Sequence, residues 1–207
     1  TMNAGIAAFR AGQAPHIIQV YEVGTATMMA AKGAVKPVYQ LMAENNEKFD
    51  PKVYIPTITG YYSTSDGRML SLPFNSSTSV MYYNKDAFKK AGLDPEKPPV
   101  TWPEFFEMAK KLKASGMEGG FSTNWISWIQ LENFSAWHNL PFGTKNNGFD
   151  GLDTQLVFNN DTVIKHLQTI YDLSKEGVFI YGGRENKANP LFSSGRVGLH
   201  FESIGGY

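Results

Sequence analysis

Tryptophan is concentrated in one segment, NWISWIQLENFSAWHNL (124–140), which contains Trp125, Trp128 and Trp137. An indole ring has a broad apolar body and one N–H donor, so it can fill a core or form a wall against which a ligand rests. Trp125 and Trp128 follow the predicted strand GGFST directly, and ligands of α/β folds bind outside the carboxyl ends of strands. This position favours a ligand role for both residues, although a place in the core remains open.

Two polar stretches near predicted strand ends could contact ligand hydroxyl groups. Glu22 follows the apolar, β-branched run HIIQVY (16–21), which predicts a buried strand. Its carboxylate could accept hydrogen bonds from a ligand, or it could cap the helix predicted after it. Ser76, Ser77 and Thr78 lie between two extended runs in LPFNSSTSVMYYN. Their hydroxyls could face a cleft, or they could stabilise a turn.

The last predicted strand, RVGLHFES, ends in Ser203 and is followed by Gly205 and Gly206. If a helix begins at this point, its free amide groups and the positive end of its dipole would form an anion site. A serine and two glycines after a strand also occur in ordinary loops, so this pattern alone does not decide between the two interpretations.

The sequence lacks the common motifs of catalytic, metal and nucleotide sites. It contains no HExxH, GxSxG, P-loop or GxGxxG pattern, no cysteine, and four scattered histidines. We therefore expect no metal, no cofactor and no catalytic site, and we favour a binding protein over an enzyme. A glycosidase with Glu22 and Glu202 as its carboxylate pair is the enzymatic alternative, although no other element of such a site is found.

Charge and hydropathy exclude two further classes of partner. Lys+Arg and Asp+Glu both number 19, so the formal net charge is zero, and no basic run could follow a nucleic-acid backbone. No apolar stretch reaches the roughly 18 residues of a membrane-spanning helix. We expect no nucleic-acid partner and no transmembrane segment.

Helical and extended segments alternate along the chain, which predicts an α/β fold with a mostly parallel sheet. One helix is expected to begin with a capping box of Thr101 and Glu104. Asp66-Gly67 predicts a hairpin turn. The predicted strands are 16–21, 77–84, 119–123, 156–159 and 196–203, and the predicted helices are 1–12, 25–35, 36–46, 85–93, 101–116, 124–140, 161–177 and 189–195.

The stretch PFNSSTSVMYYNKDAFKKAGLDPEKPPVTWPEF (73–105) resembles the maltose-binding-like extracellular solute-binding proteins. In that family a strand is followed by YNKDxFKKAGLDP and then by PxTWxE/D, which opens a helix. QVYEVGTATMMA, LKASGM, WIQLENFSAW and NNGFDG extend the resemblance from Ala4 to about Tyr207. It implies a type II periplasmic-binding-protein fold, with two α/β lobes around a ligand cleft, and family members about twice as long as this chain.

The resemblance also implies how the chain is organised and what it does. Residues 1–76 would form part of lobe 1, 77–198 part of lobe 2, and 199–207 a crossing segment returning to lobe 1; we therefore expect a fragment, in which a signal peptide would not be seen. The implied function is capture of sn-glycerol 3-phosphate by a monomeric periplasmic component of an ABC importer, with delivery to an inner-membrane permease. A sugar or a glycerophosphodiester is the alternative ligand.

Five residues match ligand-contacting positions of the family. The resemblance implies that Glu22 contacts the glycerol hydroxyls, that Ser77 contacts the ligand, and that Ser203 contacts its phosphate. It implies that Trp125 and Trp128 wall the cleft. With these two tryptophans assigned, we expect the remaining one of the segment, at position 137, to belong to the core.

The sequence departs from the family pattern at the return crossing. The family has a run such as ASSGS, whereas this chain reads ESIGGY, with Glu202 and Ile204 in unusual positions. A carboxylate beside a phosphate would repel it unless the carboxylate points away. The family's phosphate-binding arginine would lie beyond Tyr207.

Overall fold

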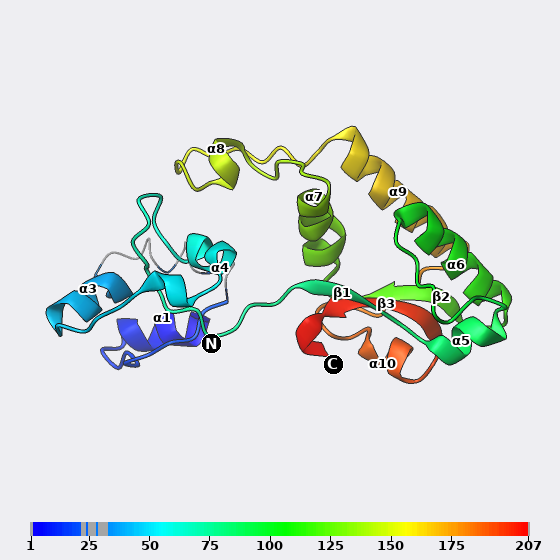
Figure 1. Cartoon of the computed structure of the whole chain (residues 1–207), viewed down its shortest axis with the longest axis horizontal. Helices are drawn as coiled ribbons and strands as arrows, with labels where there is room; N and C mark the ends of the chain where they lie inside the picture. Colours follow the sequence, from blue (N-terminus) through cyan, green and yellow to red (C-terminus); the bar gives the residue numbers. More distant parts are fainter. Residues whose placement is uncertain (1, 22–23, 25–27, 29–32, 207) are drawn as a thin grey trace. The chain divides into compact units, whose positions relative to one another are not determined.

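A computed structural model describes residues 2–21, 24, 28 and 33–206 (Figure 1). Contacts between Cα atoms divide the chain into two compact units, Thr1–Ser76 and Ser77–Tyr207, here called unit 1 and unit 2. Each unit is described by itself. The assignment of the units to lobes, and of residues 199–207 to a crossing segment, stays a prediction.

The described part of unit 1 consists of short helices joined by turns. Gly12 follows α1 with a φ of 72°, which is the left-handed conformation of a helix C-terminus. The predicted turn at Asp66-Gly67 is confirmed: Thr64 N–H donates to the Arg68 carbonyl at 2.9 Å, and Ser63 pairs with Met69 as an isolated bridge. The helices are α1 (Met2–Arg10), α3 (Val38–Glu44), the 3-10 turn η1 (Pro51–Val53) and α4 (Pro56–Tyr61).

The predicted buried strand at 16–21 is wrong. The segment has no strand hydrogen bonds among the described residues, and Ile17 is 90% exposed. A β-branched run becomes a strand only where another strand pairs with it, and the described part of unit 1 provides no such partner for it. Most of the helix predicted at 25–35 lies outside the described residues. The candidate residue Glu22 lies outside them as well.

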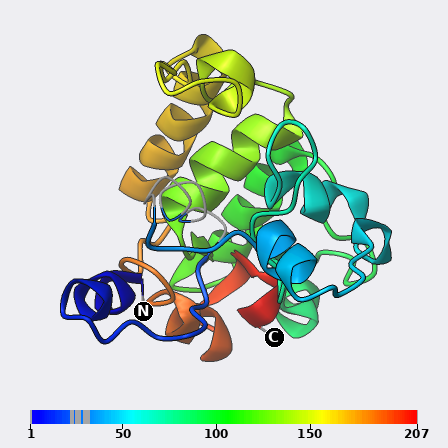
Figure 2. The ribbon, with the colours of Figure 1, turned by 90° about the vertical axis from the view of Figure 1, so that its left-hand side faces the viewer.

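Unit 2 is built on a three-stranded sheet of β1 (Ser79–Tyr83), β2 (Gly119–Thr123) and β3 (Val197–Ser203), in the order β1-β3-β2. β2 and β3 are parallel, whereas β1 and β3 are antiparallel. The expectation of a mostly parallel sheet is therefore met by one pair of strands only. The antiparallel pair brings the beginning of β1 to the end of β3. In Figure 2, β3 and the turn after it are the red segment that carries the C-terminus.

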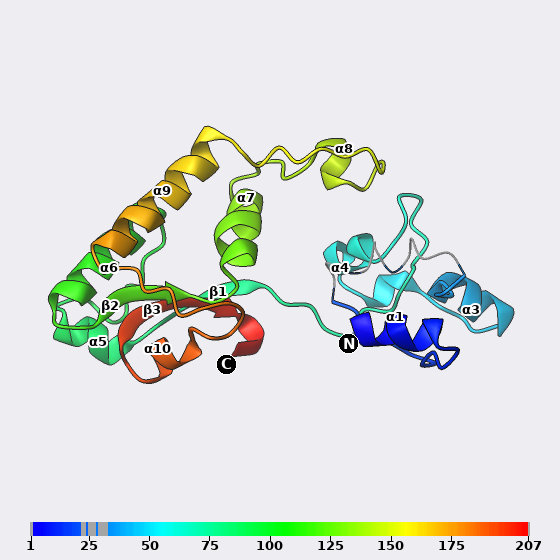
Figure 3. The ribbon, with the colours of Figure 1, turned by 180° about the vertical axis from the view of Figure 1, so that it is seen from behind.

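Helices cover both faces of this sheet. Figure 1 and Figure 3 show α6 and α9 over one face and α10 over the other. The predicted capping box is present, because Thr101 accepts from the Glu104 N–H while Glu104 accepts from the Thr101 N–H. The helices of unit 2 are α5 (Lys85–Lys90), α6 (Trp102–Ala114), the π-helical segment η2 (Trp128–Asn133) leading into α7 (Phe134–Trp137), α8 (Thr144–Asn147), α9 (Asp161–Lys175), α10 (Asn189–Ser193) and the 3-10 turn η3 (Ile204–Gly206).

The core of unit 2 lies between the sheet and α6, where Phe105, Leu112 and Phe121 are buried. Gly120 of β2 allows α6 to approach closely: a Cβ atom at this position would lie 2.8 Å from Ala109 Cα and would overlap the Ala109 carbonyl. The described residues include no helix both long and apolar enough to cross a membrane.

Candidate functional site

Three strand ends meet at one end of the sheet in unit 2, and they carry four of the five predicted site residues. Ser79, the first residue of β1, is opposite Ser203, the last residue of β3. Ser77 lies two residues before β1 and is exposed. Trp125 lies two residues after β2, and the segment of Trp128 follows it. The predicted contacts of these residues with a ligand stay predictions.

Trp125 is held in an unusual backbone conformation. Its φ is 43°, in the left-handed region that few residues other than glycine adopt. Its N–H donates to the Glu185 carbonyl at 3.2 Å, and its indole Nε1–H donates to Asn186 Oδ1 at 2.5 Å. The side chain remains 40% exposed. Such conformations persist where surrounding contacts impose them and are common at ligand sites.

Trp128 is half-buried against the core and begins the π-helical segment. The Asn133 side chain donates to the Trp128 carbonyl at 2.8 Å and accepts from the Ser79 hydroxyl at 3.1 Å. Asn133 therefore ties the wide helical turn to the start of β1. π-helical turns inside α-helices are frequent at functional sites.

Ser203 ends β3 with its side chain half-buried. The Ser203 hydroxyl accepts from the Gly205 N–H at 3.1 Å, which leaves its own proton to donate to a ligand oxygen. The helix that could have formed an anion site here is only the three-residue turn η3. An anion at this position would depend on side chains and single amides, because a turn of this length has little dipole.

Glu202, the departure from the family pattern, is buried with 3% of its surface exposed. Its Oε2 accepts from the Asn124 side-chain amide, and its Oε1 accepts from the Ser203 N–H at 2.6 Å. Both carboxylate oxygens are therefore engaged inside unit 2. These bonds hold the carboxylate beside the Ser203 backbone, and its predicted repulsion of a phosphate stays a prediction.

Sequence reasoning missed the amide side chains around the tryptophans. Asn124, Gln130 and Asn189 hydrogen-bond between elements that are far apart in the chain. One signal was available: Gln130 lies among apolar residues of a helix predicted to be covered on several sides, and an amide that becomes buried requires a polar partner. The identity of that partner depends on the fold.

Two buried histidines stand beside this amide network. Burial lowers the pKa of both His166 and His200 to about 4, so both are neutral at neutral pH. His166 Nε2 lies 3.0 Å from Gln130 Oε1, and His200 Nδ1 lies 2.7 Å from the Ser122 hydroxyl. His166 therefore carries its proton on Nε2. His200 Nε2 lies 3.4 Å from Asn189 Oδ1, which only accepts, so His200 also carries its proton on Nε2 and accepts from Ser122 on Nδ1. Both have a structural role.

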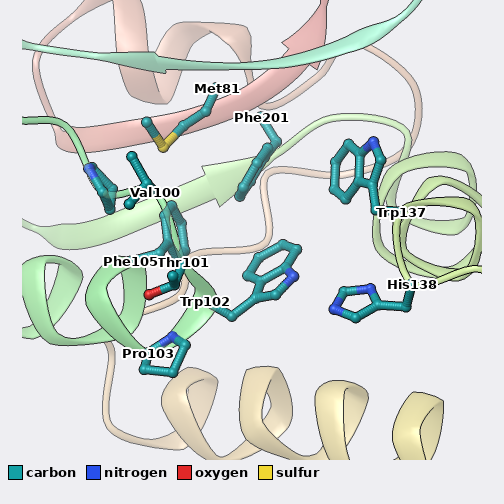
Figure 4. A pocket seen from close by; sticks show the side chains of 10 residues that line it. Met81, Val100, Thr101, Trp102, Pro103, Phe105, Trp137, His138 and Phe201 are labelled. Carbon is teal, nitrogen blue, oxygen red and sulfur yellow. The ribbon is translucent and has the colours of Figure 1, made fainter.

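A cavity of about 660 Å³ opens elsewhere in unit 2, between the sheet, the start of α6 and α7 (Figure 4). Trp137 turns toward it and is 47% exposed, so the prediction that Trp137 belongs to the core is wrong. The last turn of the helix buries Phe134 and Ser135, whereas Trp137 lies at the cavity. The lining residues are Met81, Pro99, Val100, Thr101, Trp102, Pro103, Phe105, Trp137, His138 and Phe201.

No group of histidine, cysteine, aspartate or glutamate side chains within the described ranges could hold a metal ion. Hydrogen-bond donors and aromatic surface are thus the chemistry that the strand ends offer. This combination suits a polar molecule with a small carbon skeleton.

The profile of the bacterial extracellular solute-binding protein family matches residues 1–206, and the chain belongs to this family. Its fold is that of the maltose-binding-like solute-binding proteins. The solute-binding protein of Thermotoga lettingae TMO bound with alpha-D-tagatose matches all of this chain and 52% of its own, with a TM-score of 0.74 and 20% identity. The maltose-bound MalE3 of T. maritima matches 98% of this chain and 50% of its own, with a TM-score of 0.74. The predicted fold class is confirmed.

Among curated relatives, the chain is similar to sn-glycerol-3-phosphate-binding periplasmic proteins named UgpB. It is 54% identical to that of Brucella abortus (strain 2308) over 207 residues, all of this chain and 48% of the relative. It is 56% identical to that of Escherichia coli (strain K12) over 205 residues, 99% of this chain and 47% of the relative. The chain therefore spans about half the length of these relatives.

UgpB from Mycobacterium tuberculosis, solved in complex with glycerophosphocholine, is also similar in fold. It matches 86% of this chain and 42% of its own, with a TM-score of 0.65 and 21% identity.

Proposed function

We propose that this chain is part of a periplasmic solute-binding component of an ABC importer, which captures sn-glycerol 3-phosphate between two lobes and delivers it to a membrane permease. The observation that carries the proposal is the gathering of Ser77, Trp125 and Ser203 at one end of the sheet, in a chain 54–56% identical to relatives named for this ligand. The protein acts as a monomer and has no nucleic-acid partner.

The residues have complementary roles in this proposal. The indole faces of Trp125 and Trp128 pack against the glycerol carbons and exclude water, which strengthens the polar contacts nearby. Ser77 and Ser203 donate hydrogen bonds to ligand oxygens, and Ser203 serves the phosphate. Glu22 accepts from the glycerol hydroxyls. Closure of the lobes around the ligand then creates the form that docks on the permease.

Binding alone accounts for this function, and no covalent step is required. In the glycosidase alternative Glu202 would serve as an acid or a base. Its carboxylate instead accepts bonds from Asn124 and from the Ser203 N–H, which leaves it poorly placed for proton transfer to a substrate. The proposal therefore assigns the chain no catalytic residue.

A second candidate ligand is a glycerophosphodiester. The likeness to the fold of the UgpB solved with glycerophosphocholine supports this choice. A sugar is the third candidate, since the tagatose- and maltose-bound proteins share the fold. All of these ligands offer hydroxyls and carbon faces to an aromatic wall, so direct comparison must separate them.

Thermal unfolding with a panel of ligands tests the proposal. We expect sn-glycerol 3-phosphate at 100 times its Kd to stabilise the protein by about 2.7 kcal/mol, which raises the midpoint of unfolding by several degrees. Inorganic phosphate, glycerol and maltose, each at the same concentration, are the controls and should leave the midpoint unchanged. Glycerophosphocholine measures tolerance for a substituted phosphate.

Two outcomes would contradict the proposal. A shift with maltose and none with glycerol phosphate would assign the cleft to sugars. A shift of equal size with inorganic phosphate would mean that the glycerol moiety is not recognised.

A further inference from the structure

Two buried polar residues immediately precede two of the predicted ligand residues. Asn124 precedes Trp125 after the end of β2, and Glu202 precedes Ser203 at the end of β3. The Asn124 Nδ2 donates to Glu202 Oε2 across the gap between the two strands. The bond therefore joins residues 78 positions apart in the chain, and each is covalently attached to a residue of the proposed site.

The Glu202 carboxylate extends this connection to Ser203. While Oε2 accepts from Asn124, Oε1 accepts from the Ser203 N–H at 2.6 Å. Among the described residues no cation pairs with Glu202, although the side chain is only 3% exposed. A buried carboxylate is costly unless its hydrogen bonds are made, so these two bonds fix its position.

Asn124 has all its hydrogen-bonding groups engaged. It is fully buried, and its backbone N–H donates to the Phe201 carbonyl at 3.0 Å. Its Oδ1 accepts from the Ala188 N–H at 3.0 Å, and its Nδ2 donates to Asn189 as well as to Glu202. A fully satisfied buried amide holds its neighbours in one arrangement, because any displacement leaves a group unpaired.

The same contacts reach the Trp125 side chain through the segment 185–189. Trp125 donates to the Glu185 carbonyl and, through its indole N–H, to Asn186 Oδ1. The end of that segment is held by Asn124. Asn124 and Trp125 thus bind both ends of the segment 185–189. These bonds hold Trp125 in its left-handed conformation.

We propose that Asn124 and Glu202 are positioning residues, which together fix the Trp125 indole relative to Ser203 for ligand binding. This inference rests on the proposed function, in which both of those residues contact sn-glycerol 3-phosphate. Neither member of the pair needs to touch the ligand. Loss of either leaves the other with an unpaired buried group and releases the link between the two strand ends.

Calorimetric titration of sn-glycerol 3-phosphate into a double-mutant set tests the pair. Asn124→Ala and Glu202→Ala are each expected to raise the Kd about tenfold or more. The Kd of the double variant should be no higher than that of the single variant with the higher Kd, because the second substitution removes a contact that is already lost. If the two substitutions acted independently, their fold-increases in Kd would instead multiply.

Ser122→Ala is the matched control, since Ser122 also bonds across β2 and β3, to His200, and is equally buried. Its connection to Asn124 runs through two further contacts, the first of them 3.4 Å long between His200 Nε2 and Asn189 Oδ1. It should lower the unfolding temperature while leaving the Kd within about twofold of wild type. A Kd that rises as much in Ser122→Ala as in Asn124→Ala would contradict the proposal, because general weakening of the sheet would then explain the effect.

The indole N–H resonance of Trp125, assigned with Trp125→Phe, gives a second measurement that needs no ligand. It should shift in Asn124→Ala and Glu202→Ala and stay in place in Ser122→Ala. If wild type fails to bind glycerol phosphate, the proposed function is wrong and this resonance still decides whether the pair positions Trp125. An unmoved resonance in both variants, or an unchanged Kd in both, would overturn the inference.

Discussion

Replacing Gly120 by alanine is expected to destabilise unit 2 by about 3 kcal/mol. The added methyl group would overlap the Ala109 carbonyl and lie 2.8 Å from Ala109 Cα. These atoms belong to the backbone of α6, so no side-chain rotation can relieve the overlap. The helix must move away from β2 and from the core around Phe105 and Leu112. Urea unfolding followed by circular dichroism measures the loss.

Gly60→Ala provides the matched control for this substitution. Gly60 lies in α4 and has no atom within 4 Å of the added Cβ, so alanine should be neutral or should stabilise the protein by up to about 1 kcal/mol through its helix propensity. A Gly120→Ala variant as stable as wild type would mean that β2 and α6 are not in close contact.

The stability of unit 2 is expected to fall as the pH falls from 7 to 5, by about 2 kcal/mol for each of His166 and His200. Burial lowers the pKa of each to about 4, whereas an unfolded histidine titrates near 6.5. Between these values the unfolded state binds more protons, so acidification favours unfolding. The full contribution is present above about pH 6.5. Urea unfolding at pH 7, 6 and 5 measures the slope.

Variants separate the histidines from the acidic groups. Burial raises the pKa of Glu132, so protonation of this carboxyl opposes the loss of stability. The carboxyls of Asp94, Glu104 and Glu118 have lowered pKa values because they accept hydrogen bonds or pair with cations, so they titrate below this window. His166→Gln or His200→Gln should remove about half of the loss between pH 7 and 5. His16→Gln, at an exposed position, should leave it unchanged. A pH dependence that survives both buried-site substitutions would refute the assignment.

Local patterns predicted most elements of unit 2. The capping box at Thr101 and Glu104, the strand before Asn84 and the helix that ends before Gly177 all follow from interactions within a few residues. Such signals are visible in a single stretch of sequence. The resemblance to a known family added the fold and the candidate site residues.

Features that depend on distant partners could not be predicted in this way. The run 16–21 has strand-forming residues but no pairing partner in the described part of unit 1, and pairing is a property of the fold. The sequence places Trp137 in the core only because Trp125 and Trp128 match ligand positions, yet the fold determines which side of the helix the core covers. The bond between Asn124 and Glu202 requires the register of β2 on β3.

The most direct test of the account is calorimetric titration of sn-glycerol 3-phosphate into wild type, Trp125→Ala and Trp137→Ala. Trp125 precedes and Trp137 ends one helical segment. The two are similarly exposed, at 40% and 47%, but only Trp125 lies at the strand ends. We expect saturable binding to wild type, affinity at least about thirtyfold weaker in Trp125→Ala, and a Kd within about twofold of wild type in Trp137→Ala. A wild type that releases no heat, or a Trp125→Ala variant that titrates like wild type, would contradict the proposed site.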